Sequence, residues 1–369
     1  MKVLTVVGAR PNFVKVAPLV KQMEKMGIDF DLVHTGQHYD RELSKDFFDQ
    51  LEIPDPNIYL GVGSGTHGVQ TGKTMMKMEE VLMADSYDIV LVVGDVNSTL
   101  AASIAAVKLQ IPVGHIEAGY RSFDMQMPEE VNRVLVDRVS QLLFAPTENS
   151  VLNLLNEGID KERTFLVGNI MVETLLKNIH RMERPEVLDD IGDYMVLTLH
   201  RAENTDDRNR LLSILKGAGN SDVPVIFPVH PRTKEKLRSH GINGELEKNK
   251  NIIYTKPLTY LEFQYLLAHS KCALTDSGGV QEEAMVHKVP CLTLRKNTER
   301  MITMQYGANK LVGTDTCLIS TEIGRILRGE YKAWPIPPFW DKRVSKRILS
   351  CIVDHQELLF VPTSDLITQ

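Results

Sequence analysis

The chain has 369 residues, of which 43% are hydrophobic and 24% charged, and its formal net charge is −6. This length favours two domains, because single cores rarely grow beyond roughly 250–300 residues. The acidic balance gives no sign of nucleic-acid binding, which favours a basic face. No apolar run reaches the roughly 18 residues of a membrane span, and the four cysteines have no C-x-x-C spacing that would predict a disulfide framework or a zinc site. We therefore expect a cytoplasmic, enzyme-sized protein.

In chain order, short apolar segments rich in β-branched residues alternate with segments of helical periodicity, which indicates a parallel α/β architecture. Strands of the first half are predicted at residues 3–7, 31–34, 89–93, 113–116 and 142–144, with helices at 14–26 and 98–109. The second half has predicted strands at residues 195–199, 225–229, 252–254, 273–275 and 291–294. The two series predict two doubly wound, Rossmann-like domains that face each other across a cleft.

The connections between these series set the expected domain boundaries. Residues 181–193, which include a proline and several acidic residues, are expected to link the domains, and the proline-rich residues 335–338 to return the chain to the first one. We therefore expect an N-terminal domain of residues 1–180, completed by a C-terminal helix at about 342–369. Residues 181–341 are expected to form the C-terminal domain.

Acidic residues stand at two neighbouring strand exits and at the helix that follows. Asp95 and Glu117 each come just after a predicted strand, and Glu129 lies in the first turn of the helix that Pro128 begins. Ligands of doubly wound sheets bind outside the carboxyl ends of the strands, so these acids are placed where chemistry can occur. Two structural alternatives are open: Asp95 is a helix N-cap, or Glu129, Arg133 and Asp137, spaced at i, i+4, form an exposed charge ladder.

Basic residues and histidines follow other strand exits. Arg10 and Lys15 lie in the first strand-to-helix turn, where bare backbone N–H groups suit an anion; alternatively both are solvated surface cations. His200 and His230 follow two strands of the second half, and either is a candidate for contact with a diphosphate or a substrate. A lone histidine at a strand end is also commonly a structural residue.

The most informative segment runs from Asp276 to Glu283. Ser277, Gly278 and Gly279 open a predicted helix whose amides would lie close to a ligand, so they are expected to cradle a diphosphate, with Glu283 accepting from ribose hydroxyls. An N-cap role explains Asp276 or Ser277, but it needs neither the two glycines nor the following acid.

Taken in order, these motifs resemble the non-hydrolysing UDP-N-acetylglucosamine 2-epimerases, a family with the two-domain GT-B fold. The resemblance is carried by Gly8-Ala9-Arg10-Pro11, Gly36-Gln37-His38, Gly94-Asp95, His115-Ile116-Glu117-Ala118-Gly119, Pro128-Glu129-Glu130-Val131-Asn132-Arg133, His200-Arg201-Ala202-Glu203-Asn204, Asp276 to Ala284, Arg295 with Thr298-Glu299-Arg300, and Asn309-Lys310-Leu311-Val312-Gly313.

The resemblance implies epimerisation at C2 of UDP-N-acetylglucosamine, by elimination of UDP to 2-acetamidoglucal and re-addition, with no cofactor and no metal. It implies Asp95, Glu117 and Glu129 as the acid/base set, with His200 near the diphosphate or sugar. The implied substrate-binding residues are Arg10, Lys15, Arg133, His230, Ser277, Gly278, Gly279, Glu283 and Arg300. The partner implied is the UDP-sugar, with no nucleic acid or membrane, and the assembly implied is a homodimer.

The sequence also departs from the family pattern. Asn12 stands where the family often has Glu, and Met301 follows Arg300 where Pro is frequent. Residues 124–128 and 199–206 resemble the branch that epimerises UDP-2,3-diacetamido-2,3-dideoxyglucuronate, which is the alternative substrate. Gln37 and Arg41 resemble part of an activator site for a second UDP-N-acetylglucosamine. A GT-B glycosyltransferase, a hydrolysing epimerase and an inactive UDP-sugar sensor are further alternatives.

Overall fold

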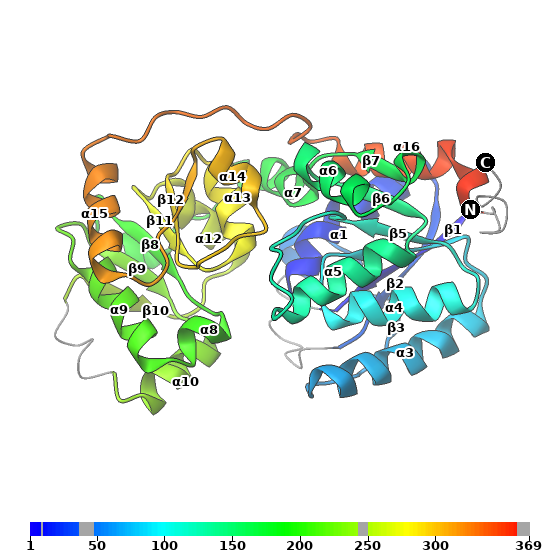
Figure 1. Ribbon diagram of the computed structural model, residues 1–369, viewed down its shortest axis with the longest axis horizontal. Coiled ribbons are helices and arrows are strands. Elements are labelled where there is room, and N and C mark those ends of the chain that lie inside the picture. The colour runs from blue at the N-terminus through cyan, green and yellow to red at the C-terminus, as the bar shows by residue number, and fades with distance from the viewer. Residues whose placement is uncertain (9, 37–47, 243–249, 360–369) are drawn as a thin grey trace. The chain divides into compact units, whose positions relative to one another are not determined.

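The computed structural model describes residues 1–8, 10–36, 48–242 and 250–359. The chain divides into two compact units, drawn in Figure 1. Unit 1 comprises Met1–Lys177 and Pro337–Gln369, and unit 2 comprises Asn178–Ile336. The chain therefore leaves unit 1 once and returns to it after residue 336.

Unit 1 is built on a parallel sheet whose seven strands, counted within the described residues, have the order β3-β2-β1-β4-β5-β6-β7. The strands are β1 (Lys2–Val7), β2 (Asp29–His34), β3 (Ile58–Tyr59), β4 (Ile89–Val93), β5 (Val113–Ile116), β6 (Leu142–Ala145) and β7 (Thr164–Leu166). All positions of β4 and β5 are buried, as expected for strands covered by helices on both faces.

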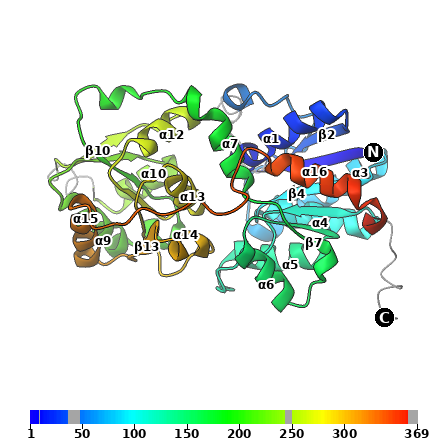
Figure 2. The ribbon, with the colours of Figure 1, turned by 90° about the horizontal axis from the view of Figure 1, so that it is seen from above.

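Helices cover the two faces of this sheet. They are α1 (Arg10–Met26), α3 (His67–Ala84), α4 (Asn97–Lys108), α5 (Pro128–Val139), α6 (Glu148–Asn156), α7 (Ile170–Asn178) and α16 (Val344–Asp354), with 3-10 turns at Lys161–Arg163 and Gln356–Leu359. Helix α4 packs between α3 and α5, and α1 packs against α16, as Figures 1 and 2 show. Because parallel crossovers are right-handed, the reversal of strand order beside β1 places these two groups of helices on opposite faces.

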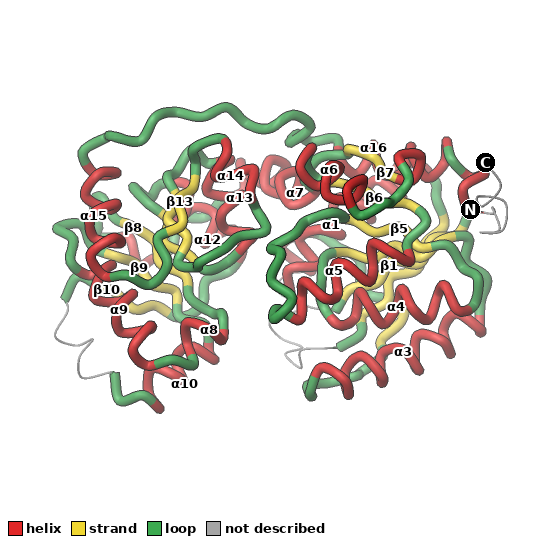
Figure 3. Tube along the Cα trace, in the orientation of Figure 1, coloured by secondary structure: helices red, strands yellow, loops and turns green. Residues whose placement is uncertain are grey.

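Unit 2 has a parallel sheet whose six strands, in the part of the chain that is described, have the order β10-β9-β8-β11-β12-β13. The strands are β8 (Met195–Thr198), β9 (Val225–Pro228), β10 (Ile252–Thr255), β11 (Ala273–Thr275), β12 (Cys291–Thr293) and β13 (Asn309–Leu311). The helices are α8 (Ala202–Thr205), α9 (Arg208–Gly219), α10 (Pro231–Ser239), α12 (Tyr260–Ala268), α13 (Gly278–Val286), α14 (Met301–Gln305) and α15 (Thr316–Leu327), with 3-10 turns at Ile179–Arg181 and Glu186–Leu188. Figure 3 shows the strands enclosed by these helices. No helix in the described ranges combines the length and the apolar character that a membrane span requires.

Strand order reverses once in each sheet, between β1 and β4 in unit 1 and between β8 and β11 in unit 2. In doubly wound sheets, ligands bind outside the carboxyl ends of the strands at such switch points. The predicted doubly wound α/β class is therefore confirmed, and each unit has one topologically favoured ligand position.

The differences from the predicted elements lie at short strands and helix starts. Strands β3, β7 and β13 were not predicted, because these segments of two or three residues are only partly buried, unlike the equally short and fully buried β11. Helix α1 begins at Arg10 rather than at residue 14, since a proline is tolerated in the first helical turn.

Candidate functional site

The carboxyl ends of β1 and β4 are joined by the side chain of Asn12. The N–H of Gly8 donates to Asn12 Oδ1 (3.0 Å), and Asn12 Nδ2 donates to the carbonyl of Val93 (3.1 Å). Asn12 is buried. The position at which the sequence departs from the family pattern therefore fixes the turn that carries Asp95.

Lys15 and Glu117 form a buried ion pair beside this turn. The alternative that Lys15 is a solvated surface cation is wrong, because only 5% of the residue is exposed. Gly94 has φ of +71°, and a Cβ built there would lie 3.0 Å from Lys15 Nζ. Glycine is therefore required at 94 both for its backbone conformation and for the close approach of the lysine.

Glu117 has two properties that are costly for stability. Its φ of +72° is rarely adopted by a residue with a long side chain. Its Oε2 pairs with Lys15, whereas Oε1 is buried and has no hydrogen-bond partner within the described residues. An unsatisfied buried acceptor costs about 1–3 kcal/mol. Such strain is concentrated at functional sites, so Glu117 is a candidate functional residue whose Oε1 is able to accept a hydrogen bond.

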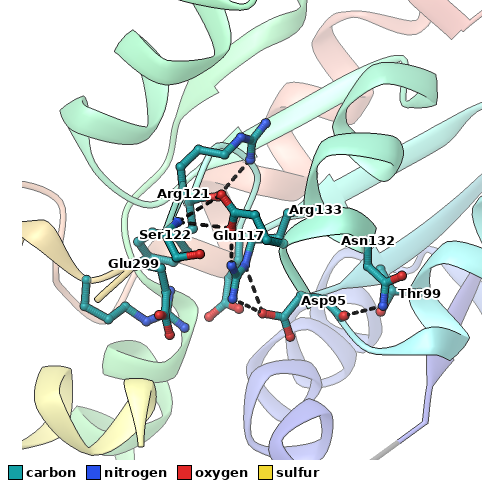
Figure 4. A network of polar contacts seen from close by, with 12 residues as sticks. Asp95, Thr99, Glu117, Arg121, Ser122, Asn132, Arg133 and Glu299 are labelled. Carbon is teal, nitrogen blue, oxygen red and sulfur yellow. Dashed lines mark hydrogen bonds and ion pairs between the residues drawn. The ribbon is translucent and has the colours of Figure 1, made fainter. Parts of the chain in front are cut away.

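Two side chains of α5 hold Asp95. Arg133 donates to Asp95 Oδ2 from Nε (3.0 Å) and Nη2 (2.6 Å), and Asn132 donates to the Asp95 carbonyl (2.8 Å), as Figure 4 shows. The N-cap alternative for Asp95 is wrong, because Val96 is the N-cap residue of α4 and makes no side-chain cap bond. The exposed charge ladder is also wrong, because Arg133 and Asp137 are buried.

The two adjacent glutamates of α5 have different surroundings. Glu130 is buried, accepts the backbone N–H groups of Ser122 and Phe123 (2.8–3.0 Å), and pairs with Arg133. Glu129 is partly exposed, one residue after the first position of the helix. Glu130 therefore holds the 122–123 loop in place, and Glu129 is the glutamate accessible to a ligand.

A buried polar cluster contacts the backbone at Gly94 and Gly119, close to Asp95 and Glu117, and was not predicted from the sequence. It joins His115 on β5 to Asp137 on α5 and extends through Arg121 to Glu157. The sequence signal was the place of His115 inside an apolar strand, where an ionisable side chain is rarely buried without a partner.

In unit 2 the switch point is organised around Asp276, which follows β11. Its buried carboxylate accepts the backbone N–H groups of His200 (3.1 Å) and Arg201 (3.1 Å) and the side-chain amide of Asn204 (3.2 Å), and pairs with His200 Nδ1 (3.0 Å). Burial raises the pKa of Asp276, but the charge of His200 and these hydrogen bonds outweigh it, so the pKa is lowered. With Nδ1 directed at Asp276, His200 offers Nε2 to a ligand, and 48% of its side chain is exposed.

Helix α13 begins at the same switch point. Ser277 is its N-cap residue and makes no side-chain cap bond, while the Ser277 N–H donates to Thr275 Oγ1 (2.9 Å). The N-cap alternative for Asp276 is therefore wrong. A Cβ built on Gly278 would lie 2.4 Å from Glu299 Oε1. Glycine at 278 therefore leaves the space that the Glu299 carboxylate occupies.

Other predicted residues of unit 2 are placed as follows. Glu283 is buried, and this burial, with the nearby charge of Glu282, raises its pKa to about 7. Arg300 is buried beside Glu282, with 3.3 Å between Nε and Oε2. His230 is the N-cap residue of α10, and its Nδ1 accepts from Arg232 N–H (3.3 Å), which is a structural contact.

Some predicted residues cannot be placed. Arg10 is the first residue of α1, but its side chain is not described, and Gln37 and Arg41 lie outside the described residues.

Comparison with known proteins decides the family. The sequence model described as UDP-N-acetylglucosamine 2-epimerase matches residues 21–353. The UDP-N-acetylglucosamine 2-epimerase of Methanocaldococcus jannaschii is 44% identical over 95% of this chain and 98% of that protein. The chain belongs to the UDP-N-acetylglucosamine 2-epimerase family. The family predicted from the sequence motifs is thus confirmed.

Two further relatives show the range of this epimerase family. The UDP-2,3-diacetamido-2,3-dideoxy-D-glucuronate 2-epimerase of Pseudomonas aeruginosa is 42% identical over 89% of this chain and 94% of that protein. The crystal structure of the M. jannaschii UDP-GlcNAc 2-epimerase, in complex with UDP-GlcNAc and UDP, matches with a TM-score of 0.90 and 44% identity over 96% of this chain and 100% of that one. The two α/β units are thus those of the GT-B epimerases.

Proposed function

We propose that this protein inverts C2 of UDP-N-acetylglucosamine to give UDP-N-acetylmannosamine, without a cofactor. Family membership supports the reaction class, since relatives of this name cover nearly the whole chain. The observation that carries the proposal for this chain is the carboxylate of Glu117. It is strained and buried at the switch point of unit 1, beside Asp95, and among the described residues only one of its two oxygens has a partner.

The proposed reaction is an elimination followed by an addition. A base removes the C2 proton, the C1=C2 bond forms, and the C1–O bond breaks with its electron pair leaving on the β-phosphate of UDP. The products, 2-acetamidoglucal and UDP, stay bound. The C1–O bond then re-forms while a proton is delivered to the opposite face of C2. Because two faces take part, the reaction requires two acid/base groups, or one group that can move between the faces.

The side chains of unit 1 are proposed to supply these groups. Asp95, Glu117 and Glu129 form the acid/base set, and Arg133 and Lys15 hold Asp95 and Glu117 in place. Fixed ion pairs keep both carboxylates oriented, so little reorganisation is needed when the proton moves.

The side chains of unit 2 are proposed to bind the nucleotide. Ser277, Gly278 and Gly279 stand at the start of α13, where bare N–H groups and the helix dipole favour a diphosphate. His200, oriented by Asp276, is proposed to donate from Nε2 to the leaving oxygen. The remaining proposed substrate contacts are Arg10, His230, Glu283 and Arg300.

The experiment that tests the activity is proton NMR of UDP-N-acetylglucosamine with the purified protein in D2O and no added cofactor. Loss of the C2 proton signal, together with new anomeric signals of UDP-N-acetylmannosamine, is the expected result. An unchanged spectrum, with UDP shown to bind, would rule out this substrate. Release of UDP only with an added acceptor, and without exchange at C2, would indicate a glycosyltransferase.

The acid/base assignment has its own test. Asp95→Asn, Glu117→Gln and Glu129→Gln are each expected to lower turnover by about 10²–10⁴-fold, the usual contribution of a general acid or base. The dissociation constant of UDP should change by less than about twofold, because these residues act on the sugar. Glu148→Gln, in the first turn of α6, is the matched control and should have wild-type turnover. Near-wild-type turnover in all three variants would overturn the assignment.

A second substrate is favoured by a specific observation. The P. aeruginosa relative named for UDP-2,3-diacetamido-2,3-dideoxy-D-glucuronate is 42% identical to this chain, so identity does not separate the two substrates. The C2 chemistry is the same in both. The same NMR experiment with the diacetamido sugar, run in competition with UDP-N-acetylglucosamine, gives the ratio of kcat/KM and decides between them.

We also propose that the protein acts in the cytoplasm as a homodimer, as the family resemblance implies. Its four cysteines are unpaired, as expected in a reducing compartment. Light scattering behind size exclusion is expected to give twice the chain mass of 41.6 kDa. A mass equal to one chain at micromolar concentration would contradict the dimer.

A further inference from the structure

The polar cluster beneath the acids of unit 1 contains a histidine with both ring nitrogens hydrogen-bonded. His115 and Asp137 are fully buried. His115 Nδ1 lies 2.6 Å from Asp137 Oδ1, and His115 Nε2 lies 2.9 Å from the carbonyl oxygen of Gly94. The imidazole therefore contacts an acceptor on each side.

These contacts fix the protonation state of the ring. The Gly94 carbonyl can only accept, so Nε2 carries a hydrogen. Asp137 Oδ2 accepts from the Gly119 N–H (3.0 Å) and pairs with Arg121 Nη1 (2.7 Å), so this carboxylate is ionised and also accepts on Oδ1. Nδ1 then carries a hydrogen too. His115 is an imidazolium, sealed inside unit 1.

The charges around this imidazolium are balanced. Burial raises the pKa of Asp137, but the charges and hydrogen bonds of His115 and Arg121 outweigh it, and its pKa is lowered. Arg121 also makes a two-pronged ion pair with Glu157, with both distances 2.7 Å. Two cations thus face two anions, and a buried charge that is paired and hydrogen-bonded is tolerated.

The other charged groups close to this cluster are themselves paired. The Lys15–Glu117 pair reaches it from α1, because Lys15 Nζ lies 3.0 Å from a Cβ built on Gly94. The Asp95–Arg133 pair adjoins it through the Gly94–Asp95 peptide and α5. Arg133 also pairs with Glu130, so the carboxylates of Glu117, Asp95 and Glu130 all lie in ion pairs.

The cluster also joins the two turns that carry the proposed acids. Through Nε2, His115 holds the carbonyl of Gly94, the residue before Asp95. Through Asp137, the pair holds the N–H of Gly119, two residues after Glu117. Both glycines have left-handed backbone conformations, with φ of +71° and +80°. One buried ion pair therefore fixes the backbone on either side of the active-site acids.

We propose that His115 is a positioning residue, held protonated by Asp137, which locks the Asp95 and Glu117 turns at a fixed separation and exchanges no proton with the substrate. The role in catalysis rests on the acid/base function proposed for those two residues. The protonation state and the clamp are properties of the folded protein and stand without it.

The first test is ¹⁵N NMR of wild-type protein labelled at histidine, without ligand. Both His115 nitrogens are expected to show the chemical shift of protonated nitrogen at pH 7. The signals of His115 are assigned by their loss in His115→Phe. His355 contacts the Cys351 carbonyl and the Phe165 ring, and His355→Gln is the control, which should keep the His115 signals. One unprotonated nitrogen on His115 at pH 7 would overturn the proposal.

The second test separates positioning from binding. Because a displacement of about 1 Å can cost about 100-fold in rate, His115→Phe is expected to lower kcat by roughly that factor. His115→Gln, whose amide can still donate to Gly94, should keep more of the turnover. KM and the dissociation constant of UDP should change by less than about twofold. Unchanged kcat, or a rise in KM alone, would overturn the positioning role.

A third variant covers the case in which the His115 variants do not fold. Asp137→Asn removes the charge that holds the proton, so in this variant His115 is expected to show one unprotonated nitrogen under the same conditions. Two protonated nitrogens in that variant would refute the role of Asp137. If the wild-type protein epimerises neither UDP-sugar, the proposed function fails, whereas the NMR result alone still decides whether His115 is the clamped imidazolium.

Discussion

Replacing Asp276 by asparagine should destabilise unit 2 by about 3 kcal/mol. In the wild-type protein, Oδ2 accepts from the Arg201 N–H and from Asn204 Nδ2, and Oδ1 faces His200. If an asparagine at 276 keeps its side-chain oxygen toward His200, its NH2 group faces the Arg201 N–H and Asn204 Nδ2. Both of these groups are donors, so neither can bond to the NH2 group. Two hydrogen bonds to a charged group are then lost, at about 1.5 kcal/mol each.

The two tryptophans allow each unit to be followed separately. Trp334 lies in unit 2 and donates to the Met285 carbonyl (2.9 Å), whereas Trp340 lies in unit 1 and donates to the Pro146 carbonyl (3.2 Å). Both are buried, and the sequence contains no other tryptophan. Urea unfolding followed by Trp334 fluorescence in a Trp340→Phe background should report the loss from Asp276→Asn. In a Trp334→Phe background, Trp340 should report an unchanged transition.

The effect also has a defined dependence on pH. The folded-state pKa of Asp276 is lowered, so its ionised form stabilises the fold above the unfolded pKa of about 3.9, and this stability is lost as pH falls through the folded pKa. The difference in the free energy of unfolding between wild type and Asp276→Asn should have its full value at pH 7 and become smaller below about pH 4. A difference below about 1 kcal/mol at pH 7, or one that is independent of pH, would refute this account of Asp276.

Two further predictions concern α13. Gly278→Ala should cost about 1–3 kcal/mol by overpacking against Glu299 and should weaken UDP binding, whereas Gly192→Ala, which meets open space, should change neither unfolding nor UDP titration. The pKa of Glu283 in the folded protein is raised to about 7. The stability that the protonated Glu283 contributes is therefore fully present below the unfolded-state pKa and is lost as the pH rises through 7. Glu283→Gln should therefore exceed wild type in urea stability at pH 8 by up to about 3 kcal/mol, and match it at pH 4; an equal pH dependence of the two proteins would contradict the shift.

The parts of the fold that the sequence predicted are those with local causes. Strands such as β4 and β5 matched their predicted bounds because a fully buried parallel strand is a continuous apolar run. Asp95 and Glu117 were placed at carboxyl ends by the same logic, since position relative to a strand is readable from the chain. The pattern of α5 was also readable, because proline in the first turn followed by acids is a strong start signal.

The pairing of side chains could not be read in this way. Lys15 and Glu117 are 102 residues apart in the sequence, and the packing of α1 beside β4, the neighbour of β5, brings them together. Asp137 had the spacing of a surface ladder yet is fully buried, because its partners His115 and Arg121 come from a different element. Helical spacing specifies which residues share a face, but not which face is covered.

The two switch points differ in the charges they hold, as the roles proposed above for the two units require. At the switch point of unit 1 lie two carboxylates, each paired with a fixed cation: Glu117 with Lys15 and Asp95 with Arg133. At the switch point of unit 2 the Asp276 carboxylate is buried, whereas the His200 imidazole that it pairs with is exposed, and the N-terminus of α13 follows it. A fixed anion suits proton removal, and fixed positive dipoles suit a leaving diphosphate. Substitutions around Glu117 should therefore lower kcat with little effect on UDP binding, and those around Asp276 should weaken UDP binding as well. Equal effects on both constants in both groups would show that the units do not divide the work in this way.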